Sequence, residues 1–251
     1  MNANNQNPCK KVTIGDIIYL INEEKKTAGV GGSISESKEI LIPYSIIYGT
    51  QEYVITSILN SSFKNLEIKS IQFPTNSQIH TFEKESFSNS MIESIQIPSH
   101  VKLIGERSFF ECIHLQRVEI LNESELQTID KEAFYHTLID NFTIPSQIVE
   151  LKKRWCVGLL NFTSINVSPE NPYFKTYNEG KFIIGKTKLD SMIFDRLFFC
   201  VRNIKTVLIP DFIKCICSYA FNECNKIQRI EFSNESNLET IESEAFINSS
   251  I

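Results

Sequence analysis

A short alternating motif, apolar then polar then apolar, recurs along most of this 251-residue chain. Its second apolar residue returns every 23 or 24 positions, at Phe73, Ile97, Ile120, Ile144 and Val167, and, after a longer interval, at Ile209 and Phe232. Alternation of this kind predicts a strand with one buried face, and the proline that often follows would end ladder pairing. The fixed interval predicts a solenoid whose strands stack into a parallel sheet.

A second element lies between these strands: an apolar residue followed five positions later by an aromatic one. The pairs are Phe82 and Phe87, Ile104 and Phe109, Ile129 and Phe134, Ile216 and Phe221, and Ile241 and Phe246. In two of them acidic residues precede Ala-Phe, which favours the start of a helix of one or two turns. Each unit is therefore predicted to be a strand, a turn and a short helical turn.

Two blocks outside the repeat resemble each other, one from Gly15 to Thr27 and one from Glu179 to Thr187. Each follows its glycine with an apolar run and Lys-Thr, which predicts a strand-turn-strand ribbon. The first ribbon would cover the open apolar end of the solenoid. The sequence thus predicts a flexible polar tail at 1–11, an N-terminal β-ribbon cap at 12–59 and a repeat domain at 60–251, with an inserted ribbon at about 169–203.

Certain units carry further fixed residues: Ile104-Gly105, Phe109 and Cys112 in one, Ser218-Tyr219-Ala220-Phe221 and Cys224 in another. With the Ile-x-Ile-Pro strands, this pattern resembles the BspA-like leucine-rich repeats of bacterial and protist surface proteins. The resemblance covers about residues 54 to 251, and it departs from the family at Cys156, which stands in the aromatic column. It implies an α/β, β-rich leucine-rich-repeat superhelix with a parallel sheet on one face and short helical turns on the other. It also implies adhesion to host cells, extracellular matrix or other microbes.

The composition limits the class of partner. Lysine and arginine number 25 against 30 acidic residues, a net charge of −5, and no basic block could neutralise a run of phosphates, so nucleic acid is not expected. The first apolar run, Ile17 to Ile21, is too short for a signal peptide or a membrane span. Seven cysteines without paired spacing favour reduced thiols or buried apolar residues. Localisation stays open: the family implies the cell surface or secretion, whereas these features favour an intracellular scaffold.

The chain stops at Ile251 within a unit, with no polar closing element. We expect an improvised cap, a truncated end or an end shielded by a partner.

Signatures of catalysis are largely missing, since no Gly-rich phosphate loop, Gly-x-Ser-x-Gly, His-Glu-x-x-His or Asp-rich calcium loop occurs. His80, His100, His114 and His136 fall in different repeat columns, so they are not expected to converge on one surface spot, and they are interpreted as structural. Two close pairs of ligand residues, Cys112 with His114 and Cys215 with Cys217, are interpreted as core rather than metal sites. No catalytic residue, metal or cofactor is predicted. An enzyme site on the inserted ribbon, from Tyr177, Asp190, Asp195 and Arg196, is the weakest alternative.

Trp155 follows Lys152, Lys153 and Arg154 and allows two interpretations. It is either an exposed cation-stacking contact or a core residue that packs sideways to replace the missing phenylalanine at position 156.

The strand side chains that point away from the core form two polar columns. As candidate partner-binding residues they are Ser70, Gln72, Ser94, Gln96, Arg117, Glu119, Asn141, Thr143, Ser164, Asn166, Thr206, Arg229 and Glu231. Alternation alone would make such positions polar, so a merely solvated sheet is one interpretation. The other is a concave surface that recognises a protein or glycan partner, with specificity set by Arg117 beside Glu119 and Arg229 beside Glu231. Asn141 and Asn166 begin glycosylation sequons, and a glycan there would compete for this face.

Overall fold

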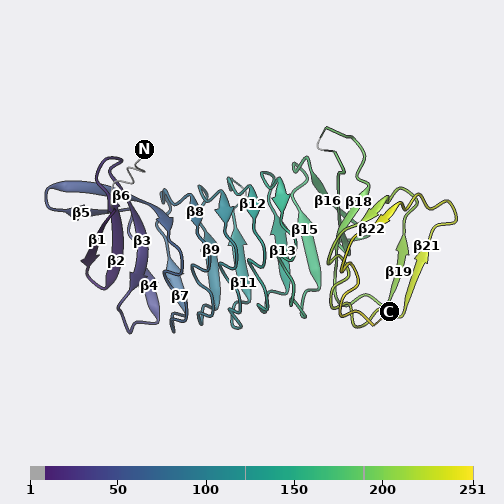
Figure 1. Cartoon of the computed structure of the whole chain (residues 1–251), viewed down its shortest axis with the longest axis horizontal. Coiled ribbons are helices and arrows are strands. Elements are labelled where there is room, and N and C mark those ends of the chain that lie inside the picture. The colour runs from purple at the N-terminus through teal and green to yellow at the C-terminus, as the bar shows by residue number, and fades with distance from the viewer. Residues whose placement is uncertain (1–8, 122, 189, 251) are drawn as a thin grey trace, which may run out of the picture.

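The structure, a computed structural model, describes residues 9–121, 123–188 and 190–250. These residues form an elongated stack of coils, with antiparallel ribbons at the N-terminal end and short strands along both sides (Figure 1). Most of the tail predicted at 1–11 lies outside the described residues, although Lys10 already belongs to a strand.

The alternating motifs form the first side of the stack, as the sequence predicts. Its strands are β4 (Glu39–Leu41), β7 (Ser70–Gln72), β9 (Ser94–Ile97), β11 (Arg117–Ile120), β13 (Asn141–Ile144), β15 (Ser164–Val167), β19 (Thr206–Ile209) and β21 (Arg229–Phe232). They pair in parallel as β11-β9-β7-β4, β13-β15 and β19-β21. Alternate residues point inward, so that Ile95 and Ile97 are buried whereas Gln96 between them is exposed.

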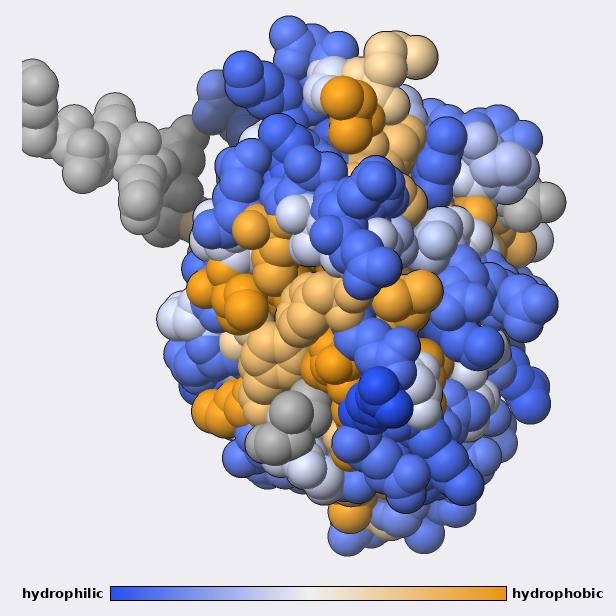
Figure 2. Space-filling model, turned by 90° about the vertical axis from the view of Figure 1, so that its right-hand side faces the viewer, coloured by the Kyte–Doolittle hydropathy of each residue, from blue (hydrophilic) through white to orange (hydrophobic). Residues whose placement is uncertain are grey.

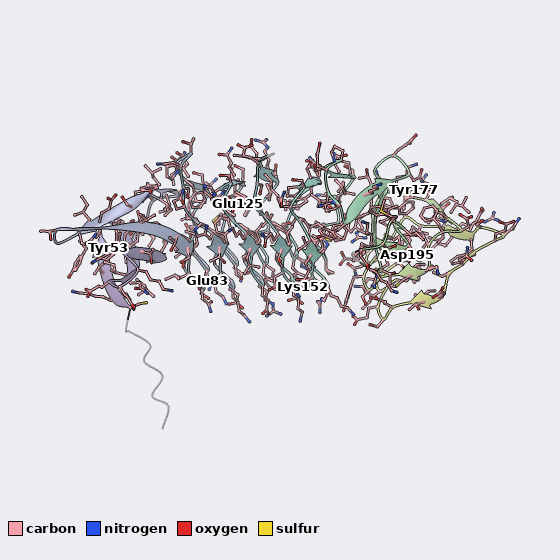
Figure 3. The ribbon with its side chains drawn as sticks, turned by 90° about the horizontal axis from the view of Figure 1, so that it is seen from above. Tyr53, Glu83, Glu125, Lys152, Tyr177 and Asp195 are labelled. Atoms are coloured by element: carbon pink, nitrogen blue, oxygen red, sulfur yellow. The ribbon has the colours of Figure 1, made fainter. Side chains whose placement is uncertain are left out.

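A second parallel sheet, which the sequence analysis did not predict, runs along the opposite side. It contains β6 (Gln51–Ile58), β8 (Thr81–Phe82), β10 (Leu103–Ile104), β12 (Thr128–Ile129) and β14 (Glu150–Leu151), and after a break β18 (Arg196–Cys200), β20 (Cys215–Ile216) and β22 (Thr240–Ile241). Glu83 and Lys152, which follow β8 and β14, lie along the same edge of the stack in Figure 3. The repeat is thus held in register on both sides.

The predicted short helical turns are wrong, because none of the described residues is helical; hence none provides a helix that could cross a membrane. Beyond its first turn, an α-helix bonds each amide to the carbonyl four residues back in the same segment. In the turn at 84–89, the amides of Ser86 and Ser88 bond to carbonyls three residues back, but those of Glu85 and Phe87 bond to the next coil, 2.9 and 2.7 Å from their acceptors. Glu85 accordingly adopts a left-handed φ of 55°. The turns form a ladder between coils instead of helices within them.

A column of phenylalanine rings fills the centre of the regular coils. Phe63, Phe87, Phe109 and Phe134 are fully buried, and successive ring centroids lie 5.4, 5.0 and 5.3 Å apart with planes within 8° of parallel. Burying each ring contributes roughly 2 kcal/mol of favourable transfer free energy. The five-residue spacing seen in the sequence is therefore the spacing between a second-sheet strand and this column.

Both glycine blocks form antiparallel hairpins. β1 (Lys10–Ile14) pairs with β2 (Ile17–Asn22) across Gly15, and β2 pairs with β3 (Thr27–Ser33), which lies parallel to β6. β5 (Ser45–Tyr48) pairs antiparallel with β6. The second block forms β16 (Phe174–Tyr177) and β17 (Phe182–Gly185) around Gly180, and β17 pairs with β18. The two glycines have φ of 58° and 79°, the left-handed conformation that glycine adopts without strain. Both ribbons therefore extend the second sheet.

The last described coil exposes apolar side chains. Phe232, Ile241 and Ile247 are 44%, 51% and 37% exposed, and Figure 2, which faces this end of the stack, shows a band of apolar residues across it. Within the described residues, β21 and β22 each pair on one side only. In the earlier coils the corresponding surface packs against the next coil.

Candidate binding face

The strand face consists of the outward side chains of the first side of the stack. Its members are Ser70, Gln72, Ser94, Gln96, Arg117, Glu119, Asn141, Thr143, Ser164, Asn166, Thr206, Arg229 and Glu231. All are exposed except Ser70 and Glu231, which are half-buried. The structure therefore places the two predicted columns on one accessible surface.

Strand register divides this surface into patches. Arg117 lies opposite Ser94, and Glu119 opposite Gln96, across β9 and β11. Across β13 and β15, Thr143 lies opposite Asn166. In the described residues no strand pairing joins β11 to β13 or β15 to β19, so the strand face is carried by three separately paired groups of strands.

The two charged pairs of the strand face differ. Arg229 Nε lies 2.7 Å from Glu231 Oε1, so this guanidinium is already partly engaged. Arg117 and Glu119 form no ion pair within the described part of the chain. The five N–H donors of Arg117 are therefore available to a partner.

A hollow of about 570 Å³ lies where β11 and β13 fail to pair. Thr143 and Asn166 of the strand face line it, together with Ser146 and Glu170 from the following loops. The sequence alone does not indicate these loop residues, because only the register of β13 and β15 brings them beside the columns. The hollow gives the face a concave feature of ligand size.

The two sequon asparagines of the face, Asn141 and Asn166, are both exposed, and the Asn141 amide donates to Asp140 Oδ1 at 2.6 Å. Asn122, which begins another sequon, lies outside the described residues. Glycosylation and partner binding thus remain competing predictions for the same surface.

Histidines come closer together than their columns predict. The rings of His80 and His100 lie 6.3 Å apart, so the prediction that the histidines stay separate is wrong for this pair. His100 Nδ1 lies 2.7 Å from Glu125 Oε1, and hydrogen bonds from His100 and Lys102 lower the pKa of that carboxyl. The group is an exposed ion-pair cluster on the turns.

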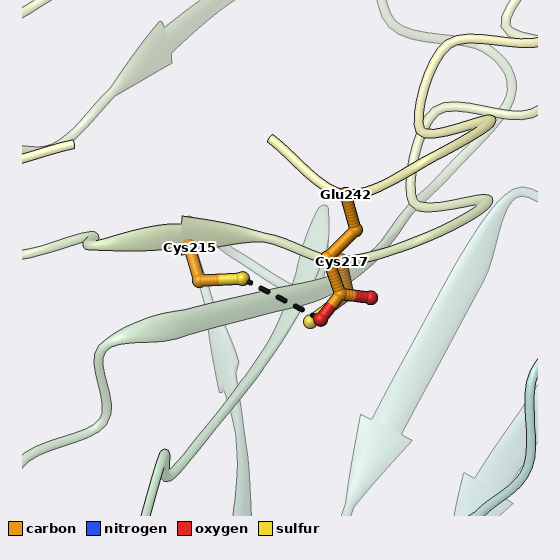
Figure 4. A group of neighbouring side chains, drawn as sticks. All are labelled: Cys215, Cys217 and Glu242. Carbon is orange, nitrogen blue, oxygen red and sulfur yellow. Dashed lines mark hydrogen bonds between the residues drawn. The ribbon is translucent and has the colours of Figure 1, made fainter. Parts of the chain in front are cut away.

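None of the seven cysteines, all in the described residues, forms a disulfide, and six of them are buried. Cys112 and Cys224 lie in the core, where the family pattern implies them. Figure 4 shows Cys215, Cys217 and Glu242, whose ligand atoms lie within 4.8 Å of one another.

An arginine already occupies the position that a metal ion would need. Arg196 Nε lies 3.3 Å from Cys217 Sγ, and its Nη2 donates to Glu242. Burial raises the pKa of Cys217 to about 12, which keeps this thiol protonated at neutral pH. A metal ion needs the thiolate, so the three residues fit a hydrogen-bonded cluster better than a metal site.

Trp155 belongs to the core, which decides between its two interpretations. It is 6% exposed and contacts the rings of Phe134, Phe142 and Phe199 at centroid distances of 6.5, 5.5 and 6.3 Å. Asp195, offered for an enzyme site, accepts the Thr187 amide at 2.9 Å and holds the ribbon.

Comparison with known proteins agrees with this geometry. A profile described as the BspA type leucine rich repeat region (6 copies) matches residues 45–159 and 159–251. No curated protein matches the sequence.

Solved structures show the same fold at low sequence identity. The pneumococcal vaccine antigen PcpA has a TM-score of 0.77 and 19% identity over 93% of this chain, which spans 66% of that structure's length, just under two thirds. A leucine rich cell surface protein from Faecalibacterium prausnitzii has a TM-score of 0.56 and 15% identity, with 93% and 76% covered. A leucine rich repeat protein from T. pallidum has a TM-score of 0.57 and 11% identity, with 93% and 84% covered. With its profile match across both halves of the solenoid, the chain belongs to the family of BspA-type leucine-rich repeat proteins.

Proposed function

We propose that this chain is a non-catalytic binding module that recognises a protein or glycan partner through the strand face. Solenoids of this kind use their long ordered surfaces for binding. The support is the exposure of eleven of the thirteen predicted residues on strands that pair in parallel in three groups along one side of the stack. Backbone that is already ordered by strand pairing loses little conformational entropy when a partner binds.

The main support for this proposal is the patch around Arg117. Arg117 and Glu119 stand in register with Ser94 and Gln96, and neither charge is neutralised by a partner in the described residues. Exposed charges in a fixed geometry select partners of complementary charge and raise association rates. A merely solvated sheet would not require opposite charges at successive outward positions of one strand.

We further propose that the module acts at a cell surface, as an adhesin or antigen-like protein that contacts host cells, matrix or other microbes. The support is the fold shared with proteins described as a vaccine antigen and a leucine rich cell surface protein. The activity of a whole surface protein remains part of this proposal, because the chain spans 66% of the PcpA structure.

The test measures binding of the purified chain to intact cells and to immobilised matrix proteins. Arg117→Ala with Arg229→Ala should weaken binding about ten-fold or more, the effect of removing interfacial arginines. Lys131→Ala is the matched control, since Lys131 is an exposed cation on a turn outside the strand face. Equal binding by the double variant and the control would contradict the choice of surface.

An intracellular scaffold is the second candidate, and the buried, unpaired cysteines favour it. A membrane-impermeant amine reagent applied to intact source cells separates the two. Labelling of the exposed lysines supports the surface proposal, whereas labelling only after lysis supports the scaffold.

A further inference from the structure

The second sheet is interrupted where the inserted ribbon enters. β14 pairs with β12, and β18 pairs with β17 and β20, but no pairing joins β14 to β18 in the described residues. A cavity of about 300 Å³ lies at this break. We name it the seam pocket; Arg154, Trp155, Arg196, Phe199, Arg202 and Tyr219 line it.

The seam pocket is basic in an acidic protein. Five basic and two acidic side chains line it, a net charge of +3, whereas the whole chain carries −5. Lys152 pairs with Glu150, Lys153 and Arg196 pair with Glu242, and Arg154 pairs with Glu132 beneath the pocket. Cationic groups concentrated in a cleft attract anions even when the protein as a whole repels them.

Aromatic rings hold the three arginines in place. Arg154 lies 5.4 Å above Tyr219, Arg196 lies 5.4 Å above Phe198, and Arg202 lies 4.5 Å above Phe199, measured to the ring centroids. A stacked guanidinium keeps its N–H donors in the plane of its edge, where they can reach a carboxylate, sulfate or phosphate. Arg154 and Arg196 already use part of these donors on Glu132 and Glu242. The arginines are thus oriented before any ligand arrives.

Among the residues that the structure describes, Arg202 has no carboxylate partner. It is 4% exposed, its Nη1 donates to the Cys200 carbonyl at 2.9 Å and approaches Cys224 Sγ at 3.4 Å, and its Nε has no partner within the described part of the chain. A buried guanidinium without a counterion is costly. An oxyanion bound in the seam pocket would offset that cost.

The volume and the lining residues of the seam pocket limit the chemical class of its ligand. A volume of about 300 Å³ is at the lower limit of small-molecule sites, and it suits a single ring. Trp155, Phe198 and Phe199 offer apolar faces, while Glu150, Glu242 and Ser218 offer acceptors for hydroxyl groups. An unsubstituted aromatic acid such as benzoate has no hydroxyl groups to donate to these acceptors, whereas a sugar acid has several.

We propose that the seam pocket binds the oxyanion-bearing ring of an acidic sugar, as found at the end of an acidic glycan. This site lies in the second sheet and is separate from the strand face. The inference stands independently of the proposed function.

The first test is isothermal titration of the full chain with glucuronate. Glucose is the matched neutral ligand, benzoate the matched aromatic acid, and inorganic sulfate the bare anion. We expect glucuronate to bind at least ten-fold more tightly than the other three and more weakly as salt rises. Equal binding of benzoate or sulfate, or no binding of glucuronate, would overturn the proposal.

The second test locates the site. Arg154→Gln and Lys153→Gln, at partly exposed positions, should each weaken glucuronate binding several-fold, and Lys131→Gln should not change it. Arg202→Gln should abolish binding if the variant folds, as circular dichroism would establish. Arg117→Ala should leave glucuronate binding unchanged, so that failure of the strand face and failure of the seam pocket are distinguishable. Loss of binding with Lys131→Gln, or none with Arg154→Gln, contradicts the assignment.

Discussion

In the coils from Phe63 to Phe134, each turn places a phenylalanine ring on the next, whereas the coils on either side of the inserted ribbon place Cys156 and Cys200 in that column. Backbone hydrogen bonds show that Cys156 and Cys200 occupy the positions that phenylalanine occupies in the regular coils. The amide of Phe134 bonds to Trp155 O just before Cys156, and the amide of Cys200 bonds to Ala220 O just before Phe221. Stacking resumes between Phe221 and Phe246 at 4.9 Å.

This difference shows what the repeat tolerates. A thiol is smaller than a benzyl group, and Trp155 and Phe199, with ring centroids 6.3 Å apart, pack in this region, while Cys156 lines the seam pocket. The remaining space lies beside the break in the second sheet, where the seam pocket opens. Regular coils thus supply rigidity, and the irregular ones supply a cavity.

The largest difference in the free energy of unfolding is expected within the column of phenylalanine rings. Phe109→Ala removes a ring held between two stacked neighbours and should lower the free energy of unfolding by about 4 kcal/mol, whereas Cys156→Ala should cost about 1 kcal/mol. Urea unfolding followed by circular dichroism measures both. Equal losses would show that the two regions are packed alike.

Gly158 tests the backbone of the irregular coil. Its φ is 86°, and an added Cβ would lie 2.8 Å from the backbone nitrogen of His136, so Gly158→Ala should cost about 3 kcal/mol. Gly49, with φ of 65° and open space around it, is the matched control and should cost about 1 kcal/mol. Thermal unfolding of the two variants compares them, and the reverse order would rule out the crowding at Gly158.

A smaller, pH-dependent effect is expected at Glu242. Burial raises its pKa, but hydrogen bonds from Ser218 and the charge of Arg196 outweigh burial, so its pKa lies below the usual 4.5. A lowered pKa stabilises the fold above the unfolded-state value, and this stability is lost as the pH falls through the folded-state value.

Glu242→Gln should therefore cost about 1 kcal/mol at pH 7 and less at pH 3, measured by urea unfolding at both pH values. Glu235→Gln, at an exposed position, is the control. A cost that grows toward acid pH would contradict the assigned direction.

The first side of the stack was predictable because its signal is long and regular. Strands of four residues such as β9 show alternation that the interval of 23 or 24 residues repeats, and the strand face follows from it. The second sheet was not predictable, since strands such as β8 contain two residues and show no period.

The helical expectation failed for a physical reason. Glu132 and Ala133 precede Phe134 as they would at the start of a helix, but Glu132 adopts a φ of 57° and the Phe134 amide bonds to the next coil. Tertiary bonds override local propensity here. The seam pocket could not be predicted from the sequence either, because its lining residues come from four separate coils, as Arg154, Arg196, Tyr219 and Glu242 show.

The buried apolar residues form two clusters, one from Val12 to Val201 and one from Phe182 to Ala245. Cooperativity in a stack of repeats passes only between adjacent units, so a weak junction divides the unfolding reaction. Hydrogen exchange should find that the Phe221 amide, bonded to Ala245, loses protection at lower denaturant than the Phe109 amide, bonded to Ala133. Simultaneous loss would mean one cooperative unit. If there are two units, a ligand bound at their junction contacts both, so its binding would couple the unfolding of two parts of the chain that otherwise unfold separately.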